Sequence, residues 1–257
     1  MSVNFKILFL LALICLTSGT SSWAEKIAVS LKPGYLVLNP EGELAVHTQG
    51  MNGTKIDVEK DLNLDNSQQL MGEAALQMGS FRLSGSYLPI RFSGKGALTR
   101  SIVFKGRDYN VGDEVEGDMD IDLYDVALSW NVINRKKEFW RFEAGPELSL
   151  KIIDSEVSMR NDTLHFDEND TVTVPIPTIG VRAMVSPLPW CSLIGRLGYL
   201  EYDRNNMLDG DLQVELSPHR NIGVFFGYRY LSFDMDETGV FIDAALEGFY
   251  GGVSVRL

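Results

Sequence analysis

The sequence predicts an all-β fold, a single antiparallel transmembrane β-barrel of about ten strands. Three observations predict it. Apolar residues recur at every second position through most of the chain, as they do in strands with one apolar face. Tight turns alternate with longer polar segments. No run of about 18 or more apolar residues follows Ala24, so a membrane-embedded chain must pair its backbone groups in a closed sheet.

The first 24 residues have the pattern of a cleaved signal peptide. Lys6 precedes an apolar run that ends at Leu16, and Ser22-Trp23-Ala24 supplies small residues for a cleavage site. The apolar run is too short to span a bilayer, which requires about 20 residues. We therefore predict a signal peptide at residues 1–24 and an outer-membrane barrel domain at residues 25–257.

Composition argues against several classes of function. The formal charge goes from −12 to −13 when Lys6, the only charged residue of the signal, is removed, and this argues against binding a nucleic acid. Only Cys191 remains in the mature chain, so neither an intrachain disulfide nor a Cys/His metal cluster is expected. No cofactor is expected.

The alternation divides the mature chain into ten expected strands, bounded by turn residues such as Gly, Pro, Asn and Ser. The expected strands span residues 26–38, 70–78, 81–92, 116–132, 138–153, 171–185, 190–202, 211–216, 221–234 and 240–257. Eight or twelve strands remain alternatives, because the strand at 211–216 and the segment after the first strand have weak patterns. An even number keeps both ends of the barrel domain on one side of a membrane.

The connections between these strands differ in length on the two sides of the expected barrel. Short turns are expected at residues 79–80, 134–137, 186–189 and 217–220. Longer polar segments, such as 47–69 and 93–115, fall on the other side. Transmembrane barrels have this asymmetry, with short periplasmic turns and longer outer loops.

The chain ends in a strand with one apolar and one polar face. The apolar face carries Phe249, Val253, Val255 and Leu257, and the polar face carries Tyr250, Ser254 and Arg256. This strand resembles the closing strand of Gram-negative outer-membrane β-barrels, although those usually end in Phe rather than Leu. The resemblance implies location in the cell outer membrane and recognition of this strand by the general outer-membrane assembly machinery. Pairing with the first strand would remove the last open edge of the sheet.

Alternation alone does not decide which face points inward. A soluble sandwich or lipocalin-like barrel, the rival fold, would place the apolar face inside. Aromatic placement favours the membrane barrel, because Phe81, Trp130, Trp140 and Trp190 are expected at one end, as an aromatic girdle at the membrane interface. Trp190 fits least well, since strict alternation places it on the face of Arg196.

The inward face then carries charges that must be paired, because an unpaired ion in a low-dielectric interior costs about several kcal/mol. We expect ladders of Arg with Glu or Asp, with bidentate arginine contacts. The expected lumen charge network consists of Arg82, Asp125, Arg141, Glu143, Glu147, Lys151, Arg182, Arg196, Arg229 and Arg256. A barrel of about ten strands should be mostly plugged by such side chains, with at best a narrow polar path.

Acidic residues gather in the expected outer segments. Asp118, Asp120 and Asp122 share the face of Tyr124 and Trp130, so this part of the strand must project beyond the lipid. Clustered carboxylates are weak candidates for a calcium site, or for a calcium bridge to the phosphates of surface lipid. They lack the spacing of an EF-hand, and a solvated acidic rim is the commoner explanation.

Two of the three histidines, His47 and His165, lie in expected outer segments that contain or adjoin Asp154 and Asp162. An Asp/His dyad at the extracellular rim is therefore the alternative function, an outer-membrane enzyme acting on lipid A or peptides. Outer-membrane proteases of the omptin type and lipid A deacylases have similar barrels and rim residues. The sequence has no motif of either family around these histidines, so we expect no enzyme.

Three segments, residues 53–65, 81–87 and 102–108, are similar to a group of functionally uncharacterised proteobacterial outer-membrane barrels. This resemblance covers about half of the chain and implies the fold without an activity. The sequence thus predicts a barrel with a structural, surface-interaction or narrow solute-permeation role. Outer-membrane lipid and lipopolysaccharide are the expected partners.

Overall fold

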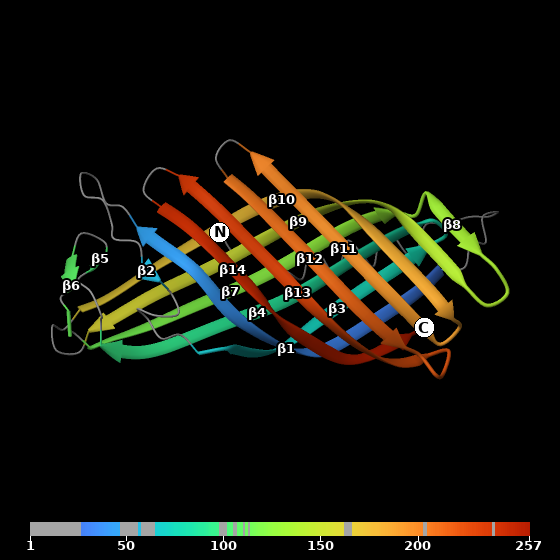
Figure 1. Ribbon diagram of the computed structural model, residues 1–257, viewed down its shortest axis with the longest axis horizontal. Helices are drawn as coiled ribbons and strands as arrows, with labels where there is room; N and C mark the ends of the chain where they lie inside the picture. The colour runs from blue at the N-terminus through green and yellow to red at the C-terminus, as the bar shows by residue number, and fades with distance from the viewer. Residues whose placement is uncertain are drawn as a thin grey trace, which may run out of the picture.

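The computed structural model describes residues 27–46, 56–57, 65–97, 102–104, 107–109, 111–112, 114–161, 166–202, 205–237 and 240–257. In this part of the chain, ten long antiparallel strands form one closed barrel (Figure 1). Within these ranges no helix is long and apolar enough to cross a membrane. The predicted signal peptide, residues 1–24, lies outside the described residues, so its cleavage remains a prediction.

Each barrel strand is hydrogen-bonded to the next one in the chain, and pairing of the last strand with the first closes the ring. The barrel strands are β1 (Ile27–Val46), β3 (Ser67–Met78), β4 (Phe81–Ala97), β7 (Glu114–Trp130), β9 (Arg141–Asn161), β10 (Phe166–Leu188), β11 (Cys191–Tyr202), β12 (Asn205–Leu216), β13 (Ile222–Glu237) and β14 (Val240–Arg256). Shorter strands are β2 (Ile56–Asp57), β5 (Ile102–Phe104), β6 (Arg107–Tyr109) and β8 (Ile133–Lys136). β2 pairs with β1, β5 with β6, and β8 with β9.

The predicted number of ten strands is confirmed, and each expected strand corresponds to one barrel strand. Several strands are longer than expected. β1 continues to Val46, and β12 begins at Asn205. The extensions lie at the outer end of the barrel, where the outer face of a strand no longer meets lipid and loses its apolar alternation.

Two expected turns are wrong. Residues 186–188, expected in a turn, belong to β10, and the turn that follows is Pro189-Trp190. Residues 134–136, predicted within a basic turn, belong to β8 and pair with β9, with Asn134 opposite Glu143. The connection from β7 to β9 is therefore a two-stranded hairpin that extends the β9 ladder. Gly145 permits the close crossing at its base, since a Cβ there would lie 1.8 Å from the carbonyl oxygen of Trp130.

Side chains alternate between the lumen and the outer surface, and the outer set is apolar along the middle of the barrel. On β9, Leu148 is 56% exposed and Leu150 is 45% exposed, whereas Lys151 is 1% exposed. A soluble barrel would bury these leucines and expose the lysine. The arrangement excludes the lipocalin-like rival and is that of a transmembrane barrel, with an apolar surface facing lipid and polar groups inside.

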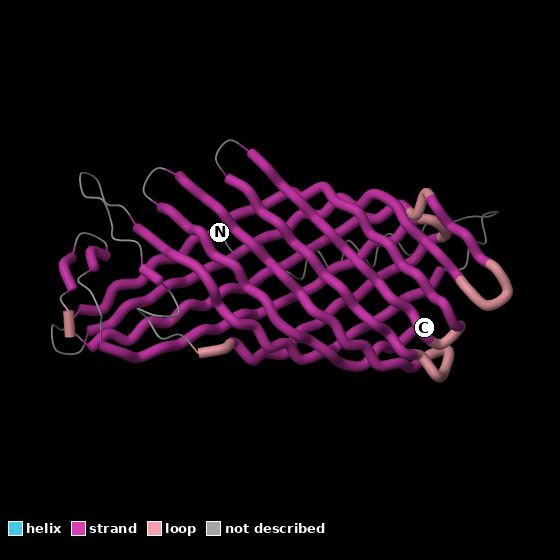
Figure 2. The backbone as a smooth tube through the Cα atoms, in the orientation of Figure 1, coloured by secondary structure: helices cyan, strands magenta, loops and turns pink. Residues whose placement is uncertain are grey.

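The short connections gather at one end of the barrel (Figure 2). The turn at Gly79-Ser80 and the turn at Pro189-Trp190 lie there, together with the C-terminal residue Leu257. Gly79 has a φ of 56°, which glycine adopts without a steric penalty. Short turns mark the periplasmic end of transmembrane barrels, and we use the terms periplasmic end and outer end accordingly.

At the outer end, β4, β7, β9 and β10 extend beyond the other strands (Figure 1). We call this extension the projecting wall. Its pairing is continuous, with Glu116 opposite Arg160 between β7 and β9, and Phe166 opposite Asn161 between β9 and β10. β2 and the β5–β6 hairpin lie near the same end (Figure 1).

The barrel closes where β14 meets β1, and this confirms the expected pairing of the last strand with the first. Their pairing runs from Ser30 opposite Arg256 to Val46 opposite Val240. The Leu257 amide donates to the carbonyl oxygen of Val29 over 2.9 Å. Gly248 lies against β1 so closely that a Cβ would be 1.9 Å from the carbonyl oxygen of Val37.

The close approach at Gly248 predicts the effect of one methyl group on barrel closure. Gly248→Ala should destabilise the folded barrel by about 1–3 kcal/mol, because the added carbon forces the two closing strands apart. We expect the compact band of the unheated protein on a denaturing gel to be lost at a lower temperature. Gly85→Ala is the matched control, since a Cβ at Gly85 meets nothing within 4 Å. Equal behaviour of the two variants would contradict the prediction.

Candidate functional site: the barrel lumen

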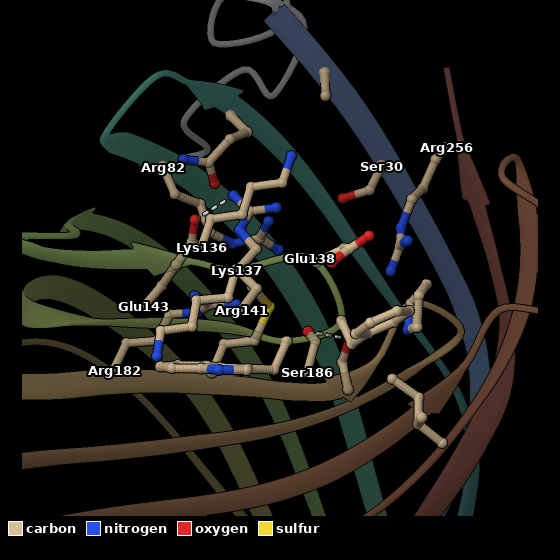
Figure 3. Close-up of a pocket in the computed structure, with 18 of the residues that line it drawn as sticks. Ser30, Arg82, Lys136, Lys137, Glu138, Arg141, Glu143, Arg182, Ser186 and Arg256 are labelled. Atoms are coloured by element: carbon tan, nitrogen blue, oxygen red, sulfur yellow. Dashed lines mark hydrogen bonds and ion pairs between the residues drawn. The ribbon is translucent and has the colours of Figure 1, made fainter.

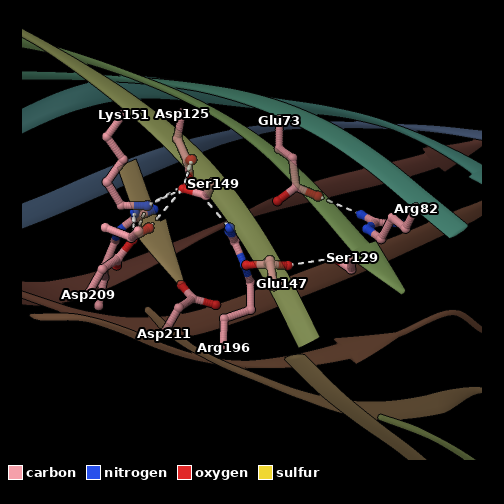
Figure 4. Close-up of polar contacts among 12 residues, drawn as sticks. Glu73, Arg82, Asp125, Ser129, Glu147, Ser149, Lys151, Arg196, Asp209 and Asp211 are labelled. Carbon is pink, nitrogen blue, oxygen red and sulfur yellow. Dashed lines mark hydrogen bonds and ion pairs between the residues drawn. The ribbon is translucent and has the colours of Figure 1, made fainter. Parts of the chain in front are cut away.

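A buried network of charged side chains crosses the centre of the lumen (Figure 4). Lys151 on β9 connects two carboxylates, because its Nζ lies 3.3 Å from Asp125 Oδ2 on β7 and 2.8 Å from Asp209 Oδ2 on β12. Ser149 on β9 donates to Asp125 over 2.7 Å and accepts from Lys151 over 2.8 Å. These contacts join strands on different sides of the barrel through their side chains.

Two arginines extend this network. Arg196 on β11 contacts Glu147 through Nε at 2.9 Å and Asp125 through Nη2 at 3.2 Å. Arg229 on β13 contacts Asp209 at 2.9 Å. Asp125 and Asp209 thus each have two cationic partners, which offsets the cost of removing charge from water.

A second set of ion pairs lies nearer the periplasmic end. Glu215 on β12 accepts from Lys32 at 3.1 Å, from Arg256 and from the Ser254 hydroxyl. Arg82 on β4 contacts Glu73 on β3 at 2.8 Å. At the base of the β8–β9 hairpin, Glu143 pairs with Arg141 and accepts from the side-chain amide of Asn131.

All ten residues of the expected lumen network lie on the inward face, where their side chains are buried or line cavities of the lumen. Nine of them, all except Arg182, have an ion-pair partner in the described part of the chain. The expectation of bidentate contacts is wrong for these arginines. Arg196 divides its two nitrogens between two carboxylates, because its partners come from different strands across the lumen.

Sequence reasoning missed seven members of the network. The missed members are Lys32, Glu73, Asp209, Asp211, Gln213, Glu215 and Tyr250. A signal was present on β12, where Asp209, Asp211 and Gln213 alternate with outward residues such as Leu212. The expected strand began at 211, so this alternation was cut short.

The outer half of the lumen is apolar, which the sequence analysis did not foresee. Ten inward side chains from seven strands pack together there, each at most 5% exposed: Leu36, Leu38, Leu88, Ile90, Phe92, Leu123, Ile176, Met207, Leu231 and Leu246. We call this set the apolar layer. It lies next to the charge network, and Tyr250 joins the two, since its ring packs with the layer and its hydroxyl donates to Asp211 over 2.6 Å.

The sequence does carry a signal for the apolar layer, in a change of phase along β4. Phe81 and Leu83 are exposed to lipid on the outward face up to Tyr87. Beyond Tyr87 the apolar residues move to the inward face, as Ile90 and Phe92 show, whereas Ser93 and Lys95 face outward. The change marks the level at which the strand leaves the lipid, because water then replaces hydrocarbon outside.

Polar groups mark this outer level on several strands. The Tyr87 hydroxyl donates to Asp122 over 2.9 Å, and Tyr35 donates to Gln68 over 3.1 Å. On β11 the Tyr199 hydroxyl donates to Glu201 over 3.0 Å. Tyrosines with an apolar ring and a satisfied hydroxyl suit a membrane interface.

The expected girdle residues lie at the opposite, periplasmic end. Phe81 and Trp130 are paired across β4 and β7, with stacked rings 6.0 Å apart. Trp130 and Trp190 are half exposed, and Trp140 is 37% exposed. The pairing of β10 with β11 is irregular between Val185 and Leu188, and Trp190 follows in the turn, so strict alternation does not hold there.

The acidic residues proposed as weak metal ligands lie on the outward face of β7. Asp122 pairs with Arg91 at 2.6 Å and Asp120 pairs with it at 3.5 Å. Among the described residues, no group of three His, Cys, Asp or Glu side chains could hold a metal ion. Arg91 thus pairs with two of the three candidate carboxylates, Asp120 and Asp122.

The alternative catalytic residues, His47 and His165, lie outside the described residues. Asp154 is described on β9, where it accepts a hydrogen bond from Thr173 over 3.0 Å. Nothing in the described chain therefore brings a histidine to this carboxylate, and the dyad remains a hypothesis.

No protein-family model and no curated protein matches the chain. Solved structures do match. The outer membrane protease OmpT from Escherichia coli is 10% identical, with a TM-score of 0.60 over 93% of this chain and 99% of that chain. The chain has the fold of a Gram-negative outer-membrane β-barrel.

Two further solved structures match with lower TM-scores. Ail, the attachment invasion locus protein of Yersinia pestis, is 11% identical with a TM-score of 0.39, over 90% of this chain and 99% of that chain. Neisserial surface protein A is 12% identical with a TM-score of 0.35, over 89% of this chain and 96% of that chain. The fold assignment rests on the OmpT match and on the closed ten-strand barrel, and an identity of 10% shows no specific activity.

The central ion pairs predict a large effect of removing Lys151. Lys151→Met should destabilise the barrel by about 3–5 kcal/mol, because Asp125 and Asp209 lose a shared cation in a buried site. Equilibrium unfolding in detergent, followed by tryptophan fluorescence, would measure the loss. Lys136→Met, at an exposed position of β8, is the control and should change stability little. A similar effect of both substitutions would argue against the network as a source of stability.

Proposed function

We propose that the protein is a closed, non-conducting barrel of the outer membrane whose role is structural or surface-interacting. The observation that carries this proposal is that two successive layers of side chains fill the lumen, the central charge network and the apolar layer. A solute would have to break the central ion pairs and then pass the apolar layer, which offers no hydrogen-bonding partners. This reasoning favours the structural or surface role over narrow solute permeation.

The dimensions of the lumen support the proposal. The space among Glu147, Lys151 and Arg196 is about 10 Å³, and the space between the network and Phe225 is about 20 Å³. Each has room for about one water molecule. Neither is large enough for a hydrated ion with its coordination shell.

The projecting wall supplies the surface for interaction. Its outward face carries acidic side chains above the lipid, among them Asp120, which is 52% exposed, and Arg91 lies between them. Below this level the outward apolar side chains would contact the acyl chains of lipid and lipopolysaccharide, and the polar rim would lie among their head groups. We keep these lipids as the proposed partners, and the assembly machinery as a proposed partner of β14.

The enzyme alternative has less support. The inward side chains of the described outer half, such as Ile90 on β4 and Met207 on β12, are apolar and offer no proton-transfer group. An active site would have to be built from outer segments that include His47 and His165.

The closed lumen predicts a silent planar bilayer. Reconstituted protein that is shown to be folded by its heat-dependent gel mobility should give no channel steps at applied voltages in simple salt. Stepwise conductance from the folded protein would overturn the proposal of a non-conducting barrel.

A separate measurement tests the enzyme alternative. Lipid A from cells with and without the protein should have the same masses by mass spectrometry, because we expect no catalytic site for lipid. A difference that disappears in a His47→Ala or His165→Ala variant would favour the alternative function instead.

A further inference from the structure

A cavity of about 400 Å³ opens into the lumen at the periplasmic end (Figure 3). We call it the vestibule. Residues of β1, β4, β10 and β14 line it together with the β8–β9 hairpin. Its charged lining residues are Arg82, Lys136, Lys137, Arg141, Arg182 and Arg256, against Glu138 and Glu143. Six cations thus face two carboxylates, in a protein whose formal charge is −12.

Ion pairs with carboxylates of the barrel do not neutralise all six of these cations. Arg82, Arg141 and Arg256 have partners, in Glu73, Glu143 and Glu215 respectively. In the described chain, Arg182 makes no hydrogen bond or ion pair with another residue. Glu73, the carboxylate that acts on it most strongly, already accepts from Arg82.

Arg182 is the decisive residue because it is also buried. It is 6% exposed and comes from β10, and its side chain lines the vestibule near Arg141 and Glu143 (Figure 3). A guanidinium group has five N–H donors and cannot lose its charge in a protein. Glu73 and Glu147 are near enough to act on the charge of Arg182, but neither forms an ion pair with it in the described chain. Burying such a cation is costly, and an anion in the cavity would supply the missing acceptor.

We propose that the vestibule binds a small soluble anion that carries a phosphate group, on the periplasmic side of the barrel. Arginine matches the geometry of phosphate oxygens through paired N–H donors, and Lys136 and Lys137 add charge from the hairpin that borders the mouth. The volume falls in the range of small-molecule sites, about 300–1,000 Å³. This site is separate from the surface role proposed for the outer end.

The rest of the lining suggests an organic phosphate. Met184, Leu188 and Trp140 contribute apolar surface on the same cavity, and Lys137 lies 5.8 Å from the centre of the Trp140 ring. A ligand with an apolar or aromatic part beside its phosphate would contact both kinds of side chain. An anionic phospholipid headgroup shares the phosphate chemistry, but Arg182 lies on the lumen side of the wall, which favours a soluble ligand.

Calorimetric titration of the full-length barrel in neutral detergent with inorganic pyrophosphate tests the proposal. We expect saturable binding, weakened about tenfold or more by Arg182→Gln, because a charge-assisted contact is lost. The double substitution Lys136→Gln with Lys137→Gln should also weaken binding. Both lysines are exposed, so this variant should fold, and it tests the proposal even if Arg182→Gln fails to fold. Arg135→Gln is the matched control, since Arg135 lies on the same hairpin and does not line the vestibule.

The outcomes separate the possibilities. Absence of saturable binding to the parent protein, or equal weakening by Arg135→Gln and the lysine double variant, would overturn the proposal and indicate general charge attraction. The titration is repeated in nanodiscs of phosphatidylcholine and in nanodiscs containing phosphatidylglycerol. Equal affinity in both supports a soluble ligand. A marked loss with phosphatidylglycerol overturns that choice and identifies the lipid headgroup as the occupant.

Discussion

Closure of the sheet is the constraint on which the rest of this structure depends. A backbone N–H or C=O group has no partner in hydrocarbon, so each strand must have a neighbour on both sides. The pairing of β14 with β1 satisfies the last open edge, and it requires backbones so close that Gly248 has no space for a side chain. The closed ring then separates two environments. One face of every strand meets lipid, and the other meets a narrow interior that side chains must fill.

That interior is filled in two different ways, and the difference follows from what lies outside the wall. Where lipid surrounds the barrel, the outward face takes the apolar residues, and the inward face is left with polar ones. These are stable only when paired across the lumen, as Lys151 is with Asp125 and Asp209. Where the strands rise above the lipid, the outer face is polar, and apolar residues such as Phe92 pack inside. The protein therefore has an ion-paired interior within the membrane and a more conventional core above it.

The two ends of the barrel differ in how their interior is filled and in the charge of the side chains there. At the outer end the apolar layer fills the lumen, and the polar side chains lie on the outer surface of the projecting wall. At the periplasmic end the lumen widens into a vestibule, where cations exceed carboxylates and Arg182 is buried without an ion-pair partner in the part of the chain that the structure describes. The barrel thus has an outer half filled by apolar side chains and a basic cavity at its periplasmic end.

The sequence by itself predicted about ten barrel strands and which residues share each face, because alternation along a strand is a local property. It also indicated that Asp118 to Asp122 must lie above the lipid, since carboxylates share a face with Trp130. It did not determine which charges pair. Asp209 and Glu73 were missed, and the bidentate contacts expected for the arginines were wrong, because partners across a lumen are fixed by the register and shear of several strands together. The aromatic placement favoured an inward polar face, and the tertiary structure confirmed it. Only the tertiary structure showed that apolar side chains close the outer half, and that Arg182 is buried without an ion-pair partner among the described residues. Each of these depends on groups brought together from distant parts of the chain.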